Sequence, residues 1–182
     1  MKKLTKNPKV EQLIEDADHL FACLHRPKQA LKKINQALSI SPDHVEGLVI
    51  KGRILFQLDR LKEAWACSKT ALSINPKFGE AYIERARMLY GIKQDFKKAL
   101  VEVKKALKYA GRDRWVRAYA LGLKGDVLEE LDQTREALKC YVEAQRLNPK
   151  DDHTHWSLGN ALSGNCQIIL SLYNQTPPFV ES

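Results

Sequence analysis

The stretch Ala71-Leu72-Ser73-Ile74-Asn75-Pro76 recurs with one substitution as Ala37-Leu38-Ser39-Ile40-Ser41-Pro42, 34 residues earlier in the chain. Weaker copies begin at Ala106 and Ala144. Every copy is preceded, seven residues upstream of its first alanine, by another alanine: Ala30, Ala64, Ala99 and Ala137. A motif that returns at a period of this size indicates an array of repeated structural units.

The spacing also predicts what each unit is. Alanines seven residues apart lie on one face of an α-helix, where their small side chains let a second helix approach closely. The proline that closes the motif ends the helix. An apolar segment upstream, such as Leu48, Gly52 and Leu55, predicts a first helix in each unit. The unit is therefore a helical hairpin that buries its apolar face only by stacking on its neighbours.

These motifs resemble the tetratricopeptide repeat family, with Leu-Gly-type positions in the first helix and Ala, a large residue, Ala and Pro in the second. The resemblance implies an all-α fold, a right-handed α-solenoid of stacked antiparallel helix pairs. We expect a basic N-terminal tail, a repeat domain of four hairpins with a partial fifth, and an apolar C-terminal cap or tail. The expected bounds are 1–10 for the tail, 11–162 for the domain (repeats 11–44, 45–78, 79–117, 118–151 and a fifth from 152) and 163–182 for the cap.

Two departures from the repeat pattern carry structural expectations. Asp18 stands where the first unit should have a small residue, at an end where no preceding repeat has to pack. The third unit is about five residues longer than the others and lacks the closing proline. Trp115, in this longer region, is expected either to begin an extended helix or to serve as an added packing residue.

The composition is that of a globular chain with a basic surplus. The 182 residues include 30 Lys or Arg and 22 Asp or Glu, which gives a formal charge of +8. No apolar run is long enough for a membrane helix, and no secretory signal follows the basic start. The four cysteines form no C-x-x-C pair, so we expect reduced thiols and a cytoplasmic location.

The last thirty residues differ from the rest, since residues 151–182 contain no Lys or Arg. The segment from Cys166 to Tyr173 is an uncharged apolar run. Three interpretations remain open: a mostly buried cap, an adhesive end that pairs with a second copy or another protein, and a truncated or alternative end of a longer array.

No residue pattern predicts an enzyme. The glycines of 159–164 have the spacing of a phosphate loop, but the Lys and Ser/Thr that should follow are missing. His153 and His155 lie at an expected helix start with no spaced Cys/His set to complete a metal site. We therefore expect no catalytic residues, no metal and no cofactor.

The family resemblance places the ligand site in a concave groove lined by first helices, with a peptide segment of another protein as the ligand. Arg53 and Arg87 would orient acidic groups, while Tyr90, Tyr119 and Trp156 would be apolar anchors. The inward positions also include Glu15, His19 and Glu46. An error of one residue in the register would instead bury the apolar members between helices. The full candidate set is Val49, Ile50, Arg53, Ile83, Arg87, Tyr90, Tyr119, Leu123 and Trp156.

A second partner class is considered because of the basic charge. RNA or another polyanion could bind the lysine-rich second helices on the convex side, but aromatic side chains are not interleaved there. We expect a protein partner rather than a nucleic acid, and no membrane association. The carboxylate clamp of repeat proteins that hold acidic chaperone tails does not fit, because Glu15, Glu80 and Glu84 fall at or near the clamp positions.

Overall fold

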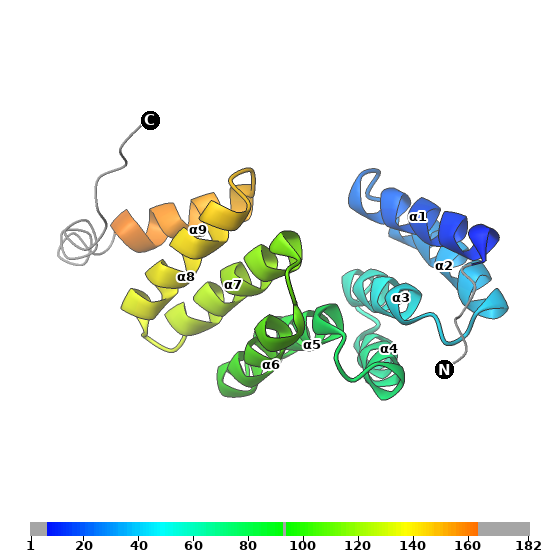
Figure 1. Cartoon of the computed structure of the whole chain (residues 1–182), viewed down its shortest axis with the longest axis horizontal. Helices are drawn as coiled ribbons and strands as arrows, with labels where there is room; N and C mark the ends of the chain where they lie inside the picture. The colour runs from blue at the N-terminus through cyan, green and yellow to red at the C-terminus, as the bar shows by residue number, and fades with distance from the viewer. Residues whose placement is uncertain (1–6, 93, 164–182) are drawn as a thin grey trace. The chain divides into compact units, whose positions relative to one another are not determined.

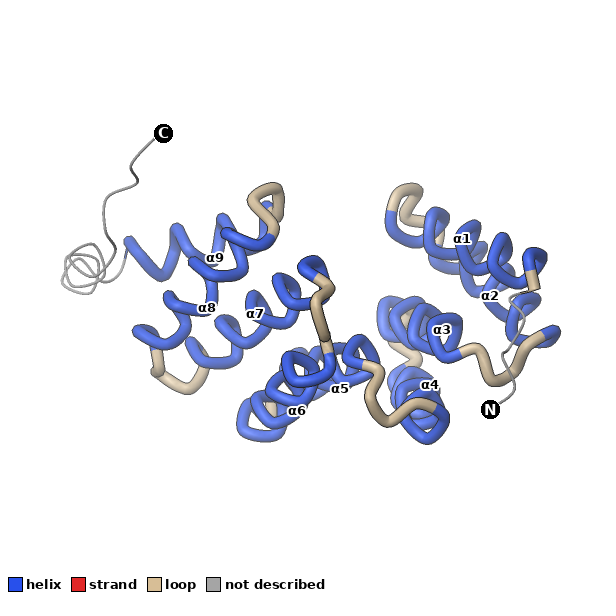
Figure 2. The backbone as a smooth tube through the Cα atoms, in the orientation of Figure 1, coloured by secondary structure: helices blue, strands red, loops and turns tan. Residues whose placement is uncertain are grey.

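The computed structural model describes residues 7–92 and 94–163, and within these ranges every regular element is an α-helix (Figure 2). The chain divides into two compact units, Met1–Tyr109 (unit 1) and Ala110–Ser182 (unit 2). In the described residues, unit 1 is built of antiparallel helix pairs, and unit 2 contains one such pair and a further helix. The structure thus confirms the all-α, repeat-type fold class that the alanine motif predicts.

Unit 1 consists of three hairpins, drawn from blue to green in Figure 1. The two helices of each hairpin pack on each other, α2 packs on α3, and α4 packs on α5. The first helices also touch, α1 with α3 and α3 with α5. The helices are α1 (Pro8–Ala22), α2 (Pro27–Ile40), α3 (Val45–Gln57), α4 (Leu61–Ile74), α5 (Gly79–Gly91) and α6 (Phe96–Tyr109).

Unit 2 contains one full hairpin and one further helix in its described part. Helix α7 (Arg114–Glu129) pairs with α8 (Thr134–Leu147), and α9 (Asp152–Ser163) packs on both of them. The apolar segment 166–173 and its three interpretations lie outside the described residues. The expected cap or tail at 163–182 is therefore left as a prediction.

The alanines of the repeat motif form the contact surface between paired helices. Both members of each pair are 0–1% exposed in all four hairpins. Around them lie larger apolar side chains, for example Val10, Ile14 and Ile34 in the first hairpin. Burying such a side chain contributes roughly 1.5–3 kcal/mol, so the stability of a hairpin depends on its partner helix and on the next unit.

The turn inside each hairpin contains one non-glycine residue in the left-handed region. His25, Asp59, Gln94 and Asp132 have φ values of 50°, 58°, 46° and 57°, and each lies two residues before the second helix. The next amide donates back into the first helix, as from Arg60 N to Leu55 O at 2.9 Å. Three residue types (His, Asp and Gln) thus adopt the same turn conformation at four positions, so these turns do not require a glycine.

The structure differs from the sequence expectation at two helix positions. Ala17, rather than Asp18, is fully buried, because the α1–α2 turn (23–26) is one residue longer than the α3–α4 turn (58–60). Helix α7 begins at Arg114, inside the expected third repeat, because the Asp113 carboxylate accepts the amides of the following helix start at 2.9 and 3.0 Å. Trp115 therefore lies in the first turn of an extended helix.

Candidate functional site

A surface cavity of about 290 Å³ opens between α1 and α3 in unit 1. Its floor includes Ile14 and Ile50, which are 4% and 5% exposed. Its rim carries ionisable side chains, namely Glu15, Asp18, His19 and Glu46. We call these cavity residues, together with Arg53 and Arg87 on the same side of α3 and α5, the first-helix face.

Arg53, expected to bind an acidic ligand, already has a carboxylate partner on the neighbouring helix. Its Nη2 atom donates to Asp18 Oδ1 at 2.6 Å, so the ion pair joins α3 to α1. The guanidinium carbon also lies 5.9 Å from the centre of the Phe21 ring, within cation–π range. The Arg53 guanidinium is therefore paired within the protein, where it links the first hairpin to the second.

Arg87 is paired in a similar way. Its Nη1 atom lies 3.3 Å from Glu84 Oε2, one turn earlier on α5, and its guanidinium carbon lies 5.3 Å from the Phe56 ring centre. Glu84 is only 6% exposed, and this burial raises the pKa of its carboxyl group, although Arg87 and Arg53 act in the opposite direction. Arg87 thus supplies the nearest compensating charge for a buried carboxylate.

The charge that remains for a ligand on the first-helix face is negative. Within residues 7–92 and 94–163, no cation pairs with the Glu15 or Glu46 carboxylate, and both residues are exposed. Both occupy inward positions in the repeat register. In the sequence, the first helices carry more carboxylates than guanidinium groups, and this surplus is the feature from which Glu15 and Glu46 could have been predicted. A rim of this kind accepts N–H donors and favours cationic groups.

Four apolar members of the candidate groove set are buried in the structure. Their exposed fractions are only 2–8%, and they pack between helices, as the alternative expectation describes: Val49, Ile50, Ile83 and Leu123. Val49 packs with Ala71 and Ala81, and Ile50 packs with the core of the first hairpin. Only Ile50 contributes to the site, as part of the cavity floor.

The predicted aromatic anchors fall in different units. Tyr90 belongs to unit 1, where its ring lies 5.9 Å from the Phe96 ring. In unit 2, Tyr119 is stacked on Trp115, with ring centres 5.7 Å apart and an interplanar angle of 3°. Trp156 is 69% exposed on α9. The candidate residues therefore form two separate sets, one on each unit.

Unit 2 also contains a polar cluster that the repeat pattern does not predict. The Tyr141 hydroxyl on α8 lies 3.0 Å from Asp126 Oδ1 and 2.8 Å from Glu129 Oε2, both on α7. The Tyr141 hydroxyl has one hydrogen and can donate a full hydrogen bond to only one of these two carboxylates. Burial raises the pKa of the Asp126 carboxyl group. From α9, His153 Nε2 lies 3.7 Å from Asp126 and the Ser157 hydroxyl lies 3.4 Å from it. The cluster therefore connects all three helices.

Other site types find little support in the part of the chain that the structure describes. No group of three or more His, Cys, Asp or Glu side chains there is arranged to hold a metal ion. None of the helices in that part is long and apolar enough to span a membrane.

Antiparallel helix pairs that repeat about every 34 residues and bury alanines between them define a helical-repeat protein. The family model for the tetratricopeptide repeat matches residues 45–78 and 118–151, the bounds expected for the second and fourth units. Residues 45–78 and 118–151 of this chain are therefore tetratricopeptide repeats. Repeats of this family form protein–protein interaction modules and generally act as non-catalytic scaffolds.

Comparison with known proteins agrees with this family. Human tetratricopeptide repeat protein 6 is 28% identical over 133 residues, which cover 73% of this chain and 24% of that protein. The chain thus spans about a quarter of the length of this curated relative.

Two solved structures illustrate the likeness in fold. A thermophilic tetratricopeptide repeat protein of Thermus thermophilus has a TM-score of 0.74 at 21% identity, covering 91% of this chain and 89% of that one. PilW, a widely conserved type IV pilus biogenesis factor, has a TM-score of 0.76 at 18% identity, covering 89% and 72%. At these identities the likeness concerns the fold alone.

Proposed function

We propose that this chain is a non-catalytic adaptor that binds an apolar and basic segment of a partner protein on the first-helix face. The observation that carries the proposal is the cavity between α1 and α3, with isoleucines in its floor and Glu15 and Glu46 at its rim. A Lys or Arg side chain of the partner fits this arrangement, because its aliphatic stem covers the apolar floor while its charged end reaches the carboxylates.

This proposal changes the expected sign of the ligand. The two arginines that would attract an acidic peptide are paired with Asp18 and Glu84 of the same chain. An acidic ligand would have to compete with these carboxylates and would approach Glu15 and Glu46. A basic ligand meets uncompensated negative charge without breaking an internal ion pair.

We also propose that the chain works in a reducing compartment such as the cytoplasm. Cys67 and Cys140 are free thiols buried between helices, and Cys23 is a free thiol at the surface. Burial raises the pKa of both buried thiols, which keeps them protonated and unreactive.

The first experiment uses three sets of short synthetic peptides that share the same apolar residues but carry Lys/Arg, Asp/Glu or only neutral polar residues. We expect the basic set to bind the full chain most tightly. Binding of the basic set should fall by about tenfold or more in the Glu15→Lys/Glu46→Lys variant, because attraction is replaced by repulsion at the rim.

The matched control is Glu130→Lys/Glu136→Lys, which makes the same change in net charge at exposed positions of unit 2. This variant should bind the basic set as the wild type does. Preferential binding of the acidic set, or equal binding by both charge variants, would refute the proposal.

A further inference from the structure

A second surface of unit 1, on the side of α4 and α6, contains two cavities that share Trp65. One has a volume of about 340 Å³ and includes Leu89 and Val101, and the other has a volume of about 310 Å³ and includes Met88 and Ile92. Met88 and Leu89 are buried, whereas Ile92 and Val101 are 41% and 51% exposed. We call these five residues the Trp65 surface. It offers two apolar depressions beside one indole ring.

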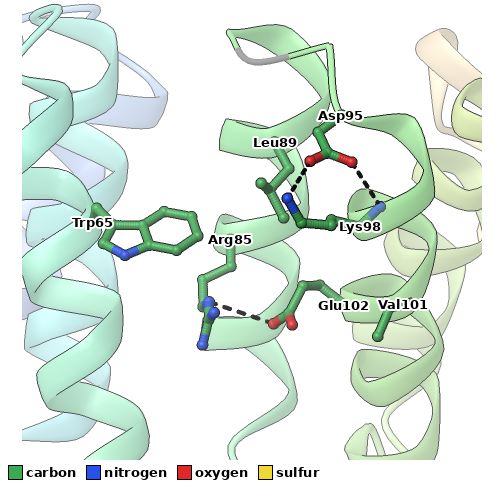
Figure 3. A pocket seen from close by; sticks show the side chains of 7 residues that line it. All are labelled: Trp65, Arg85, Leu89, Asp95, Lys98, Val101 and Glu102. Atoms are coloured by element: carbon green, nitrogen blue, oxygen red, sulfur yellow. Dashed lines mark hydrogen bonds and ion pairs between the residues drawn. The ribbon is translucent and has the colours of Figure 1, made fainter.

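Charged side chains on the walls of the larger cavity form two ion pairs, Arg85 with Glu102 and Asp95 with Lys98 (Figure 3). The Arg85 guanidinium carbon lies 4.8 Å from the centre of the Trp65 ring, and Arg85 Nε lies 3.4 Å from Glu102 Oε2. Lys105 donates to the other Glu102 oxygen at 3.0 Å. Glu102 is 6% exposed, so its charge is compensated inside the protein and does not add to the surface field.

The surroundings of the Trp65 surface are strongly basic. Helices α4 and α6 carry two glutamates, and both are neutralised by neighbours: Glu63 is held at 2.7 Å by Arg60, and Glu102 by Arg85 and Lys105. The same two helices carry seven lysines, all exposed: Lys62, Lys69, Lys97, Lys98, Lys104, Lys105 and Lys108. Lys62 lines the smaller cavity, and Lys98 lines the larger one, where it is paired with Asp95 at 2.7 Å. Of these seven lysines, those left without a carboxylate partner among the described residues are Lys62, Lys69, Lys97, Lys104 and Lys108.

From these observations we infer that the Trp65 surface is a second docking site, whose occupant is an acidic segment of a partner protein with at least two apolar side chains. The apolar side chains enter the depressions on the two sides of Trp65, and the acidic side chains face the surrounding lysines. Charge complementarity favours an acidic occupant, because exposed lysines of α4 and α6 surround the depressions. The first-helix face has the opposite charge and would not attract the same segment. The inference is independent of the function proposed for that face.

A peptide fits this surface better than a nucleic acid does. One side of the Trp65 ring is already covered by the Arg85 guanidinium, which leaves less of the indole for stacking on a base. The depressions are lined mainly by aliphatic groups, which match Leu, Ile or Met side chains. RNA that bound here would depend on the lysines but not on Ile92 and Val101, and this difference separates the two ligands experimentally.

The test uses the full chain with Trp115→Phe and Trp156→Phe, which leaves Trp65 as the only tryptophan. Its fluorescence is followed during titration with helix-forming peptides that carry two leucines one helical turn apart in glutamate-rich, lysine-rich or neutral backgrounds, and with polyuridylate. We expect the glutamate-rich peptides to bind with a blue shift. Ile92→Ser/Val101→Ser should weaken this binding by about tenfold or more, because apolar burial is lost while the charge stays the same.

The matched control is Val142→Ser, at a similarly exposed valine (48%) on α8 of unit 2, which should leave the affinity unchanged. Far-UV circular dichroism confirms that each variant is folded. The inference is overturned if no glutamate-rich peptide binds, if lysine-rich peptides bind equally, or if the Ile92/Val101 variant binds as the wild type does. Binding of polyuridylate alone would assign the surface to nucleic acid instead.

Discussion

Gly125→Ala should destabilise unit 2, although alanine is the better helix former. A Cβ atom on Gly125 would lie 2.7 Å from both Cδ1 and Cζ of Tyr141 and closer still to Cε1. Carbon atoms in contact are normally about 3.5–4.0 Å apart. Tyr141 cannot move into solvent, since it is fully buried and its hydroxyl is held by Asp126 and Glu129.

The magnitude follows from three contributions. Overpacking costs about 1–3 kcal/mol, and a lost hydrogen bond to a charged group costs about 1.5–3 kcal/mol. The higher helix propensity of alanine offsets about 1 kcal/mol of this loss. We therefore expect the free energy of unfolding to fall by about 1.5–5 kcal/mol. The matched control, Gly52→Ala, occupies the same repeat position in unit 1, where the nearest atoms would lie 3.5 and 3.6 Å away. It should raise stability by about 0.5–1 kcal/mol.

The assay is urea unfolding of the full chain followed by tryptophan fluorescence. In a Trp65→Phe background the signal comes from Trp115 and Trp156 and reports on unit 2, whereas Trp115→Phe/Trp156→Phe reports on unit 1. Adding Tyr141→Ser, which copies Ser68 of the second repeat, should make Gly125→Ala harmless. If Gly125→Ala is as stabilising as Gly52→Ala, or if its cost persists beside Tyr141→Ser, the close-packing explanation is wrong.

Two further predictions concern buried charges. Burial raises the folded-state pKa of Asp126 above its unfolded value, so the folded state binds this proton more tightly. The contribution of Asp126 to stability therefore rises as the pH falls through the folded pKa. Asp126→Asn should therefore be more stable than the wild type near neutral pH, and the difference in stability should close as the pH falls towards about 4. Urea unfolding midpoints measured across this pH range check the prediction. A difference that stays constant with pH would contradict it. For the Glu84–Arg87 pair, Arg87→Gln should cost about 3 kcal/mol with Glu84 present and much less beside Glu84→Gln. A double-mutant cycle in urea tests this coupling, and additive effects would show that Arg87 does not compensate the buried carboxylate.

Much of the fold could be predicted from the sequence because one local pattern carries it. The alanine pairs and the closing prolines act within a single hairpin, and the structure buries those alanines as expected. The repeat spacing does not give the register where a turn changes length. One extra residue between α1 and α2 moves Ala17 into the buried position that the repeat spacing assigns to Asp18.

The charges of the candidate site could not be predicted in the same way. Arg53 and Asp18 are 35 positions apart and meet only because α1 and α3 are neighbours in space. A periodic pattern places a residue on a helix face but does not say which opposite charge faces it from the next helix. For this reason the sequence pattern predicts Arg53 and Arg87 as the charged ligand-binding residues. In the structure, Glu15 and Glu46 are the charges available to a ligand.

The location of a bound peptide tests the proposed function most directly. A photo-crosslinking amino acid replaces His19, an exposed residue that lines the cavity, or Val142 as the control, and the full chain is irradiated with the basic apolar peptide bound. We predict crosslinking from position 19 and none from position 142, with loss of the crosslinked product in the Glu15→Lys/Glu46→Lys background. Equal crosslinking from both positions, or crosslinking from 19 that survives the charge reversal, would contradict binding on the first-helix face.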